Sequence, residues 1–184
     1  KISIDSANLM NKVFEVIEAC KIFKFNKKKY RIMIHPQSYV HSIIRFKNGL
    51  IKMILYNTDM KIPISNTLYG RKNHVLNVKK IDARILSKLS FQNVNTKRFP
   101  SIKLINKCLN LGFLAPTIVN ASNEVLVSLF LTKKIGFLKI VKTINKIFRD
   151  KDFKKHAKRK PESIKDIQIT DNWARLKTLA MCVR

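Results

Sequence analysis

The spacing of apolar residues predicts a helix near the start of the chain. An apolar stripe recurs there at helical intervals: Leu9, Val13, Ile17 and Cys20. The residues before Asp5 read as a strand that runs into this helix. Asp5 and Ser6 stand just ahead of the stripe, where short oxygen-bearing side chains cap free backbone N–H groups. We therefore predict a strand, a cap and a helix with one buried face.

Short apolar runs in the next segment predict strands. One run stops at Pro36, and two further runs are joined by Asn48-Gly49, a pair that is typical of tight hairpin turns. We predict that residues 31–57 form strands of a small mixed sheet and that the first helix packs against one face of it. Pro63 then breaks the pattern, and a short helix ends at Gly70.

A polar and irregular connection over residues 72–98 separates this part from a helical one that begins at Pro100. The helices predicted by 3.6-residue periodicity cover residues 101–112, 116–134, 137–150 and 170–183. A charged loop to Glu162 precedes the last helix, which Thr170 or Asp171 would cap. The predicted fold class is α+β, with a small mixed sheet and packed helices followed by a C-terminal helical bundle.

Composition places the chain among folded proteins of a reducing compartment. Its 184 residues are 46% hydrophobic, which is enough to build a core. No apolar run reaches the roughly 18 residues of a membrane span, and no signal peptide is visible, so we expect no membrane partner. The three cysteines are far apart and odd in number, which favours the cytoplasm. Because the chain begins with Lys1, we expect a fragment.

A net charge of +27 raises the question of nucleic-acid binding. Of the 38 basic residues 29 are Lys, and they are scattered over almost every segment. Lys, Asn, Ile and Phe share AT-rich codons, so codon bias explains the pattern, and only Lys27–Arg31 and Lys151–Lys160 are dense. A nucleic-acid module would concentrate its charge on one face. We expect no specific nucleic-acid partner, and a basic binding module is the less favoured alternative.

Three polar residues in the first helix permit two interpretations. Asn11 and Glu15 are four apart and share a face, and Lys12 lies beside them. One interpretation is a capped helix with a Lys–Glu surface pair. The other is a ligand site. The Ser6 hydroxyl, the Asn11 amide and the Lys12 ammonium at a helix N-terminus suit a phosphate, and the Glu15 carboxylate one turn later suits a metal.

Four separate motifs occur in order along the chain. They read KISIDSANLMNK with a glutamate at residue 15, then IHPQSYVHS, TDMKIPI and NASNEV. Together they resemble the 1-deoxy-D-xylulose 5-phosphate reductoisomerases of the non-mevalonate isoprenoid pathway, from Lys1 to at least Phe137. The resemblance implies an NADPH-dependent, metal-dependent homodimeric enzyme with a dinucleotide-binding domain, a catalytic domain and a helical bundle. It implies the second half of the catalytic and dimerisation domain at residues 1–87, a linker at 88–98 and the bundle at 99–184.

The resemblance also assigns roles to single residues. Ser6, Asn11 and Lys12 stand where the family holds the substrate phosphate. Glu15 stands where the family has the last of three carboxylate ligands of Mg²⁺ or Mn²⁺, and it also counts among the substrate-binding residues. His41 would support the active site, and the position of Met60 lies under the nicotinamide end of the site.

Other polar residues have structural interpretations. His35 alone is more typical of a hydrogen-bonded structural histidine. We predict that Asn120, Asn123 and Glu124 supply caps and interhelical hydrogen bonds.

Departures from the family pattern limit what the chain can do alone. Val13 replaces a glycine that usually follows the lysine, which would shift packing near the phosphate but keep the helix. The chain has only four glycines and no Gly-rich dinucleotide loop, and the segment with the first two metal ligands is missing. We predict part of an enzyme that converts 1-deoxy-D-xylulose 5-phosphate to 2-C-methyl-D-erythritol 4-phosphate, inactive alone. A non-catalytic remnant or dimerisation fragment is the alternative.

Overall fold

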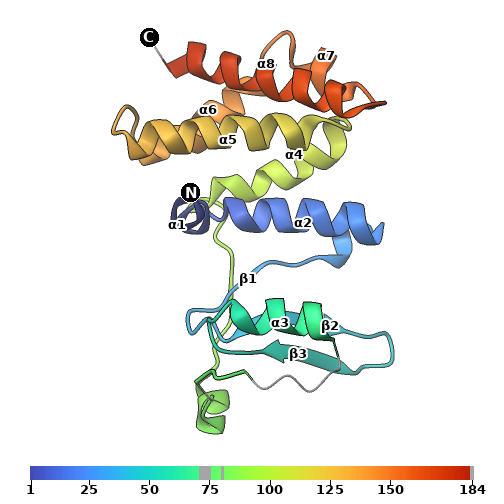
Figure 1. Cartoon of the computed structure of the whole chain (residues 1–184), viewed down its shortest axis with the longest axis vertical. Coiled ribbons are helices and arrows are strands. Elements are labelled where there is room, and N and C mark those ends of the chain that lie inside the picture. The colour runs from blue at the N-terminus through green and yellow to red at the C-terminus, as the bar shows by residue number, and fades with distance from the viewer. Residues whose placement is uncertain (71–75, 80, 183–184) are drawn as a thin grey trace. The chain divides into compact units, whose positions relative to one another are not determined.

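The computed structural model describes residues 1–70, 76–79 and 81–182, which form two compact units. Lys1–Arg31 and Asn95–Arg184 form the first, here named the helical unit, and Ile32–Val94 form the second, the hairpin unit. Figure 1 labels their α-helices and the strands β1, β2 and β3. This division differs from the predicted segments 1–87, 88–98 and 99–184, because the first helices group with the bundle. The predicted segments remain a prediction about the domains of a longer protein.

The helical unit begins with two short helices that meet at a sharp junction. Helix α1 covers Ile2–Ala7 and helix α2 covers Met10–Phe23. Between them Leu9 adopts a left-handed conformation with φ of 60°, and the Asn8 side chain accepts a hydrogen bond from the Met10 N–H at 2.9 Å. The predicted strand before Asp5 is therefore wrong. The predicted cap is wrong as well, because Asp5 is buried inside α1 and Asn8 bonds the first N–H of α2.

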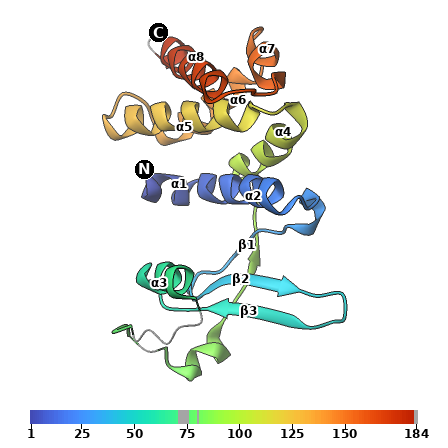
Figure 2. The same cartoon turned by 45° about the vertical axis from the view of Figure 1, so that its right-hand side comes forward.

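Helix α2 buries one face, as its apolar spacing predicted. Val13 and Ile17 are buried, together with Met10, which the pattern did not include. The face packs on α4 (Lys103–Leu111) and on the 3₁₀ turn η3 (Pro100–Ile102). We predicted the sheet as the partner of the first helix, but the partner within the helical unit is α4, which Figures 1 and 2 both show beside α2.

Helix α5 is the centre of the bundle, and it packs against α4, α6, α7 and α8. The bounds are Ala115–Leu131 for α5, Phe137–Ile147 for α6, Phe153–Lys158 for α7 and Ile164–Cys182 for α8. Its core includes Ala115, Ile118, Ala121, Ile147, Phe153, Ala157 and Ala174. The predicted charged loop thus contains a helix, α7, because Phe153 and Ala157 supply one buried face at i, i+4 spacing.

The last helix begins earlier than predicted. Asp166, in its first turn, accepts hydrogen bonds from the N–H groups of Glu162 at 3.0 Å and Ser163 at 3.1 Å. Thr170 is buried in the helix interior, so the predicted cap at Thr170 or Asp171 is wrong. A carboxylate that reaches back to the groups ahead of the helix fixes its start.

The hairpin unit contains the predicted strand pair. Strand β2 (Val40–Arg45) pairs antiparallel with β3 (Ile51–Leu55), with Ile43 opposite Met53. Gly49 has φ of 88°, which confirms the predicted turn, because glycine adopts this conformation without steric cost. A second antiparallel pair joins β1 (Met33–Ile34) to β4 (Gln92–Asn93). The strands thus form two antiparallel pairs in place of one mixed sheet.

The remaining elements are short helices. Helix α3 covers Lys61–Tyr69 and ends at Gly70 as predicted, whereas Pro63 lies within its first turn. A proline is tolerated there because the first N–H groups of a helix have no intrahelical partner. Two 3₁₀ turns are η1 (Lys27–Lys29) and η2 (Ala83–Lys88). Residues 71–75 and 80, within or beside the predicted irregular connection, lie outside the described residues.

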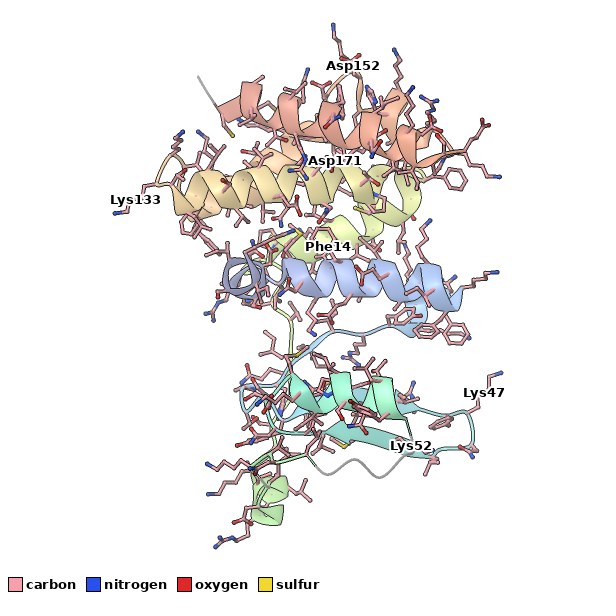
Figure 3. All side chains as sticks on the ribbon, viewed as in Figure 1. Phe14, Lys47, Lys52, Lys133, Asp152 and Asp171 are labelled. Carbon is pink, nitrogen blue, oxygen red and sulfur yellow. The ribbon has the colours of Figure 1, made fainter. Side chains whose placement is uncertain are left out.

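Two surface properties bear on possible partners. Among residues 1–70, 76–79 and 81–182, no helix combines the length and the apolar character that crossing a bilayer demands. Basic side chains occur on many elements, and Figure 3 labels Lys47 in the β2–β3 turn, Lys52 on β3 and Lys133 after α5. This scatter agrees with the interpretation of the charge as a compositional bias.

We predict that Gly112→Ala destabilises the helical unit strongly. Gly112 ends α4 with φ of 135°, and an added Cβ would lie 2.3 Å from the backbone oxygen of Ala157. Strain and overpacking together should lower the free energy of unfolding by about 2–4 kcal/mol, which a urea titration of the chain measures. Gly136→Ala is the control, because a Cβ there meets nothing within 4 Å. Equal effects of the two substitutions would contradict this account.

We also predict that the contribution of Asp166 to stability depends on pH. The N–H of Glu162, then that of Ser163 and the charge of Arg159, lower the pKa of this carboxyl group. A group whose pKa is lower in the folded state stabilises fully above its unfolded pKa of about 3.9, and this stabilisation decreases below that value until it is lost as pH falls through the lower folded pKa. The difference in urea midpoint between wild type and Asp166→Asn should therefore shrink from pH 6 to pH 3.

Glu18→Gln, at an exposed carboxylate on α2, is the matched control for Asp166→Asn. Its midpoint should stay near that of wild type over the same pH range. A difference for Asp166→Asn that is the same at pH 6 and pH 3 would show that the charge of this carboxylate does not stabilise the helix start.

Candidate functional site

The junction between α1 and α2 brings two of the predicted residues together. Ser6 is exposed near the end of α1, and Asn11 lies in the first turn of α2. The Asn11 side-chain amide donates a hydrogen bond to Ser6 Oγ at 3.0 Å and a long one to the Ile2 carbonyl at 3.5 Å. A hydroxyl and an amide that share one surface can both donate to an anion that displaces their mutual bond.

The other two predicted residues form an ion pair. Lys12 Nζ lies 2.7 Å from Glu15 Oε2, and the two side chains are 47% and 55% exposed. The interpretation as a surface Lys–Glu pair thus describes the free chain correctly. Such an exposed pair contributes about 0–1 kcal/mol, so a phosphate or a cation can separate it at little cost.

The N-terminus of α2 adds to the attraction for an anion. Helix α2 has 14 residues, and its first N–H groups carry partial positive charge because they lack intrahelical partners. Asn11 and Lys12 stand in this first turn, and Glu15 follows one turn later. Here we name Ser6, Asn11, Lys12 and Glu15 the phosphate-end group, because three of them could donate to a phosphate at this terminus.

The phosphate-end group contains one candidate ligand for a divalent metal. Glu15 supplies a half-exposed carboxylate, the ligand type that Mg²⁺ and Mn²⁺ prefer. Within the part of the chain that the structure describes, no cluster of three or more His, Cys, Asp or Glu side chains could hold a metal. The phosphate-end group therefore offers one carboxylate of the type that binds these ions.

Buried polar residues from other elements hydrogen-bond to both sides of the α1–α2 junction. The Asn123 amide on α5 donates to Asp5 Oδ1 at 2.9 Å, and both residues are almost fully buried. On the other side of the junction, the buried Ser101 hydroxyl donates to the Asn8 carbonyl oxygen. Sequence reasoning missed Asn8 and Ser101 altogether. Asp5 was interpreted as a helix cap, although its position next to the predicted site residue Ser6 could have indicated a role in supporting the site.

The interhelical bonds predicted for three polar residues of α5 are confirmed for two of them, Asn123 and Glu124. Glu124 accepts from Lys1 Nζ at 2.6 Å and from Arg175 Nη2 at 2.5 Å. The hydrogen bond from Lys1, then that from Arg175, lowers the pKa of Glu124. The carboxylate therefore stays charged near neutral pH and links α8 to the first residue of the chain.

The histidines and Met60 lie in the hairpin unit. The His41 ring stacks on Tyr56 at 3.7 Å, and its Nε2–H donates to the Tyr56 carbonyl at 3.2 Å. His35 lies 2.8 Å from the Ser90 carbonyl through Nδ1, which fits the structural role predicted for it. Met60 is 67% exposed, so it is not the buried filler that a methionine usually is. Roles for His41 and Met60 stay predictions.

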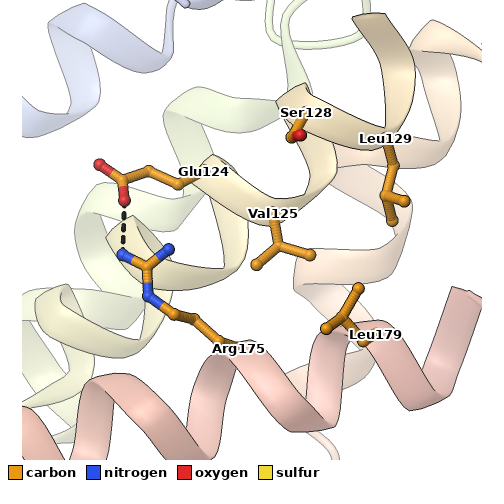
Figure 4. Close-up of a pocket in the computed structure, with 6 residues that line it drawn as sticks. All are labelled: Glu124, Val125, Ser128, Leu129, Arg175 and Leu179. Carbon is orange, nitrogen blue, oxygen red and sulfur yellow. Dashed lines mark hydrogen bonds and ion pairs between the residues drawn. The ribbon is translucent and has the colours of Figure 1, made fainter. Parts of the chain in front are cut away.

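Two other features do not provide a site. An open hollow of about 240 Å³ lies between α5 and α8. Figure 4 shows Glu124 and Arg175 paired with each other there, beside Val125 and Leu129. Because the two charged side chains that line the hollow pair with each other, the hollow presents no unpaired charge that would select a ligand. Burial raises the pKa of the Cys108 thiol to about 12, so this cysteine is not a nucleophile near neutral pH.

Two family models match the chain. The DXP reductoisomerase C-terminal domain matches residues 55–177, and the 1-deoxy-D-xylulose 5-phosphate reductoisomerase C-terminal domain matches residues 1–23. The reductoisomerase of Pelagibacter ubique is 44% identical over 183 residues, which are 100% of this chain and 47% of that protein. The Zymomonas mobilis enzyme is 36% identical over 181 residues, which are 98% of this chain and 45% of that protein.

Solved structures agree with these relatives. The Zymomonas mobilis reductoisomerase in complex with NADPH has a TM-score of 0.87 and 36% identity, over 98% of this chain and 47% of that one. A DOX-P reductoisomerase with fosmidomycin and magnesium has a TM-score of 0.92 and 31% identity, over 98% and 46%. This chain thus spans about half the length of the relatives it matches. The resemblance carried by the four motifs is confirmed, and the chain belongs to the 1-deoxy-D-xylulose 5-phosphate reductoisomerase family.

Proposed function

We propose that this chain is the C-terminal part of an enzyme that converts 1-deoxy-D-xylulose 5-phosphate to 2-C-methyl-D-erythritol 4-phosphate with NADPH and a divalent metal. One observation carries the proposal. This chain belongs to the family, and one short segment around the N-terminus of its helix α2 contains Ser6, Asn11, Lys12 and Glu15. Related structures hold NADPH, magnesium and the phosphonate fosmidomycin.

In this proposal the phosphate-end group anchors the substrate by the end that does not react. The phosphate oxygens accept hydrogen bonds from the Ser6 hydroxyl, the Asn11 amide and the Lys12 ammonium, and the α2 N-terminus favours their charge. Bonds to a charged group contribute about 1.5–3 kcal/mol each, which exceeds the worth of the exposed Lys12–Glu15 pair. Phosphate binding therefore separates this pair and leaves Glu15 free.

Glu15 then serves as one oxygen ligand of Mg²⁺ or Mn²⁺. When bound, the ion acts as a Lewis acid on the oxygens of the substrate while its carbon skeleton rearranges, and NADPH supplies the hydride. Within this chain we assign His41 and Met60 supporting roles toward the nicotinamide end. We assign the binding of the NADPH dinucleotide and the other metal ligands to parts of the enzyme outside this chain.

Location and assembly are further parts of the proposal. We propose a cytoplasmic homodimer that has no specific nucleic-acid partner and no membrane partner. The β2–β3 hairpin would carry the subunit contact. Ile43, Ile51 and Met53 on one face of it are 38–56% exposed, an apolar surface of the kind that a second subunit covers.

We predict different kinetic effects for Lys12→Ala and Glu15→Gln in the complete enzyme. Lys12→Ala should raise KM for the phosphorylated substrate by about 10- to 100-fold, because it removes a charged hydrogen bond. Glu15→Gln keeps the shape but removes the negative charge at the metal, so turnover should fall steeply and more metal should be required. Steady-state kinetics with a metal titration of each variant measures both effects.

The control for Glu15→Gln is Glu18→Gln, which removes the next carboxylate along α2. NADPH binding should stay unchanged in all three variants. Wild-type turnover and metal dependence in Glu15→Gln would refute the site and leave the surface-pair interpretation. A wild-type protein without reductoisomerase activity would refute the proposed function and favour a non-catalytic fragment.

We predict that Met53→Glu weakens the proposed homodimer. Met53 and Ile43 face each other across the β2–β3 pair, and a carboxylate there would lose its water in a dimer contact. Analytical ultracentrifugation of the complete protein should show a dissociation constant raised at least about tenfold. Lys52→Glu, at the next residue and on the other face of the pair, is the matched control. Equal dimerisation by wild type and Met53→Glu would exclude this face as the contact.

A further inference from the structure

We infer that Asn123 is a positioning residue that holds Ser6 in place for phosphate binding. The inference rests on the proposed function, because it assigns to α5 a part in the same site. Asn123 lies in the middle of α5, is fully buried, and its side-chain amide donates to Asp5 Oδ1 at 2.9 Å. Asp5 is only 2% exposed and directly precedes Ser6. The bond therefore ties α5 to the residue before the proposed phosphate ligand.

The energetics make this bond a strong constraint. A buried carboxylate without a donor loses its hydration and gains nothing in return, which costs far more than an ordinary hydrogen bond contributes. Asp5 can meet the Asn123 amide only when α1 has its present position along α5. The neighbouring contact from Lys1 to Glu124, with side chains 42% and 33% exposed, is solvated and constrains α1 less.

The junction is also fixed from its second side. The Ser101 hydroxyl, fully buried in η3, donates to the Asn8 carbonyl oxygen, and the Asn8 side chain accepts from the Met10 N–H. Between these bonds Leu9 is held at φ of 60°, a conformation that leucine rarely adopts. α1 and α2 are thus held independently, and the result is a Ser6 Oγ that lies 3.0 Å from Asn11 Nδ2.

The consequence for binding is specific to the phosphate. When Asn123 loses its amide, α1 can shift relative to α2, and Ser6 no longer meets an oxygen of a phosphate held by Asn11 and Lys12. Asn11, Lys12 and Glu15 stand on α2 itself and keep their mutual spacing. Asn123 therefore acts through Ser6, and its effect on affinity should depend on the Ser6 hydroxyl.

A double-mutant cycle on the complete protein tests this dependence. The probe is fosmidomycin, the phosphonate present in related crystal structures, titrated calorimetrically with saturating magnesium. Asn123→Ala should weaken binding about tenfold in the wild-type background. In the Ser6→Ala background the same substitution should weaken it by less than about threefold, because the hydroxyl that it positions is already absent.

Two further variants separate positioning from general damage to the fold. Asp5→Asn together with Asn123→Asp keeps one amide and one carboxylate at the contact, so affinity should return to within about threefold of wild type. Asn120→Ala changes a half-buried residue one turn earlier on α5 and should bind as wild type does. If Asn123→Ala fails to fold by circular dichroism, Asn123→Ser, whose shorter side chain removes the amide donor but stays polar, enters the cycle in its place, with a loss expected only when Ser6 is present.

The possible outcomes distinguish the inference from the proposed function. A wild-type protein that does not bind fosmidomycin overturns both. Wild-type binding with equal losses for Asn123→Ala with and without the Ser6 hydroxyl overturns the inference alone, as does an Asn123→Ala variant with wild-type affinity. Dependence on Ser6 together with recovery in the exchanged pair supports it.

Discussion

The hydrogen bond from Asn123 to Asp5 connects the two parts of the molecule on which the candidate site depends. Asn123 belongs to α5, the helix that contacts most other elements of the bundle. Asp5 belongs to α1, a helix of six residues that is too short to be stable alone. A buried carboxylate needs its donor, so the bundle determines where this short helix lies. The bundle thus supports the phosphate-end group, although none of its own side chains belongs to that group.

Much of the fold could be predicted because its elements have strong local signals. These signals act within a few residues: the Asn48-Gly49 turn, the glycines that end α3 and α4 (Gly70 and Gly112), and the periodicity of α5 and α6. The structure has these elements close to where the sequence predicted them. The start of α8 was missed although its signal is local, because Asp166 bonds the N–H groups three and four residues before it. Other failures occurred where tertiary contacts outweigh local preference. The first residues form α1, and Asp5 within it has its partner on α5, 118 positions away. Helix α7 exists because Phe153 and Ala157 reach the core.

For the candidate site, the sequence predicted the side chains that could bind ligands but not the contacts that hold them in place. The types of Ser6, Asn11, Lys12 and Glu15 and their spacing suggested phosphate and metal chemistry, and the order of four motifs added a family. Local reasoning could have found Asn8, because asparagine is a preferred residue just ahead of a helix, but it could not find Ser101, whose partner is a backbone carbonyl 93 positions away. It also could not foresee the left-handed Leu9, a conformation that the surrounding hydrogen bonds impose. The residue types and spacing of ligand-binding side chains can be recognised in a sequence, whereas distant contacts that fix the backbone conformation cannot.

The ion pair between Lys12 and Glu15 shows why two interpretations of one segment need not compete. In the free chain the two side chains satisfy each other at 2.7 Å, as an ordinary surface pair does. Since the pair is half exposed, it contributes little to stability, and the same exposure makes both charges available. An anion at the α2 N-terminus attracts Lys12, and a cation attracts Glu15. A surface pair of this kind protects neither charge from a ligand, so each partner balances the other's charge in the free chain and stays available to a phosphate or a cation.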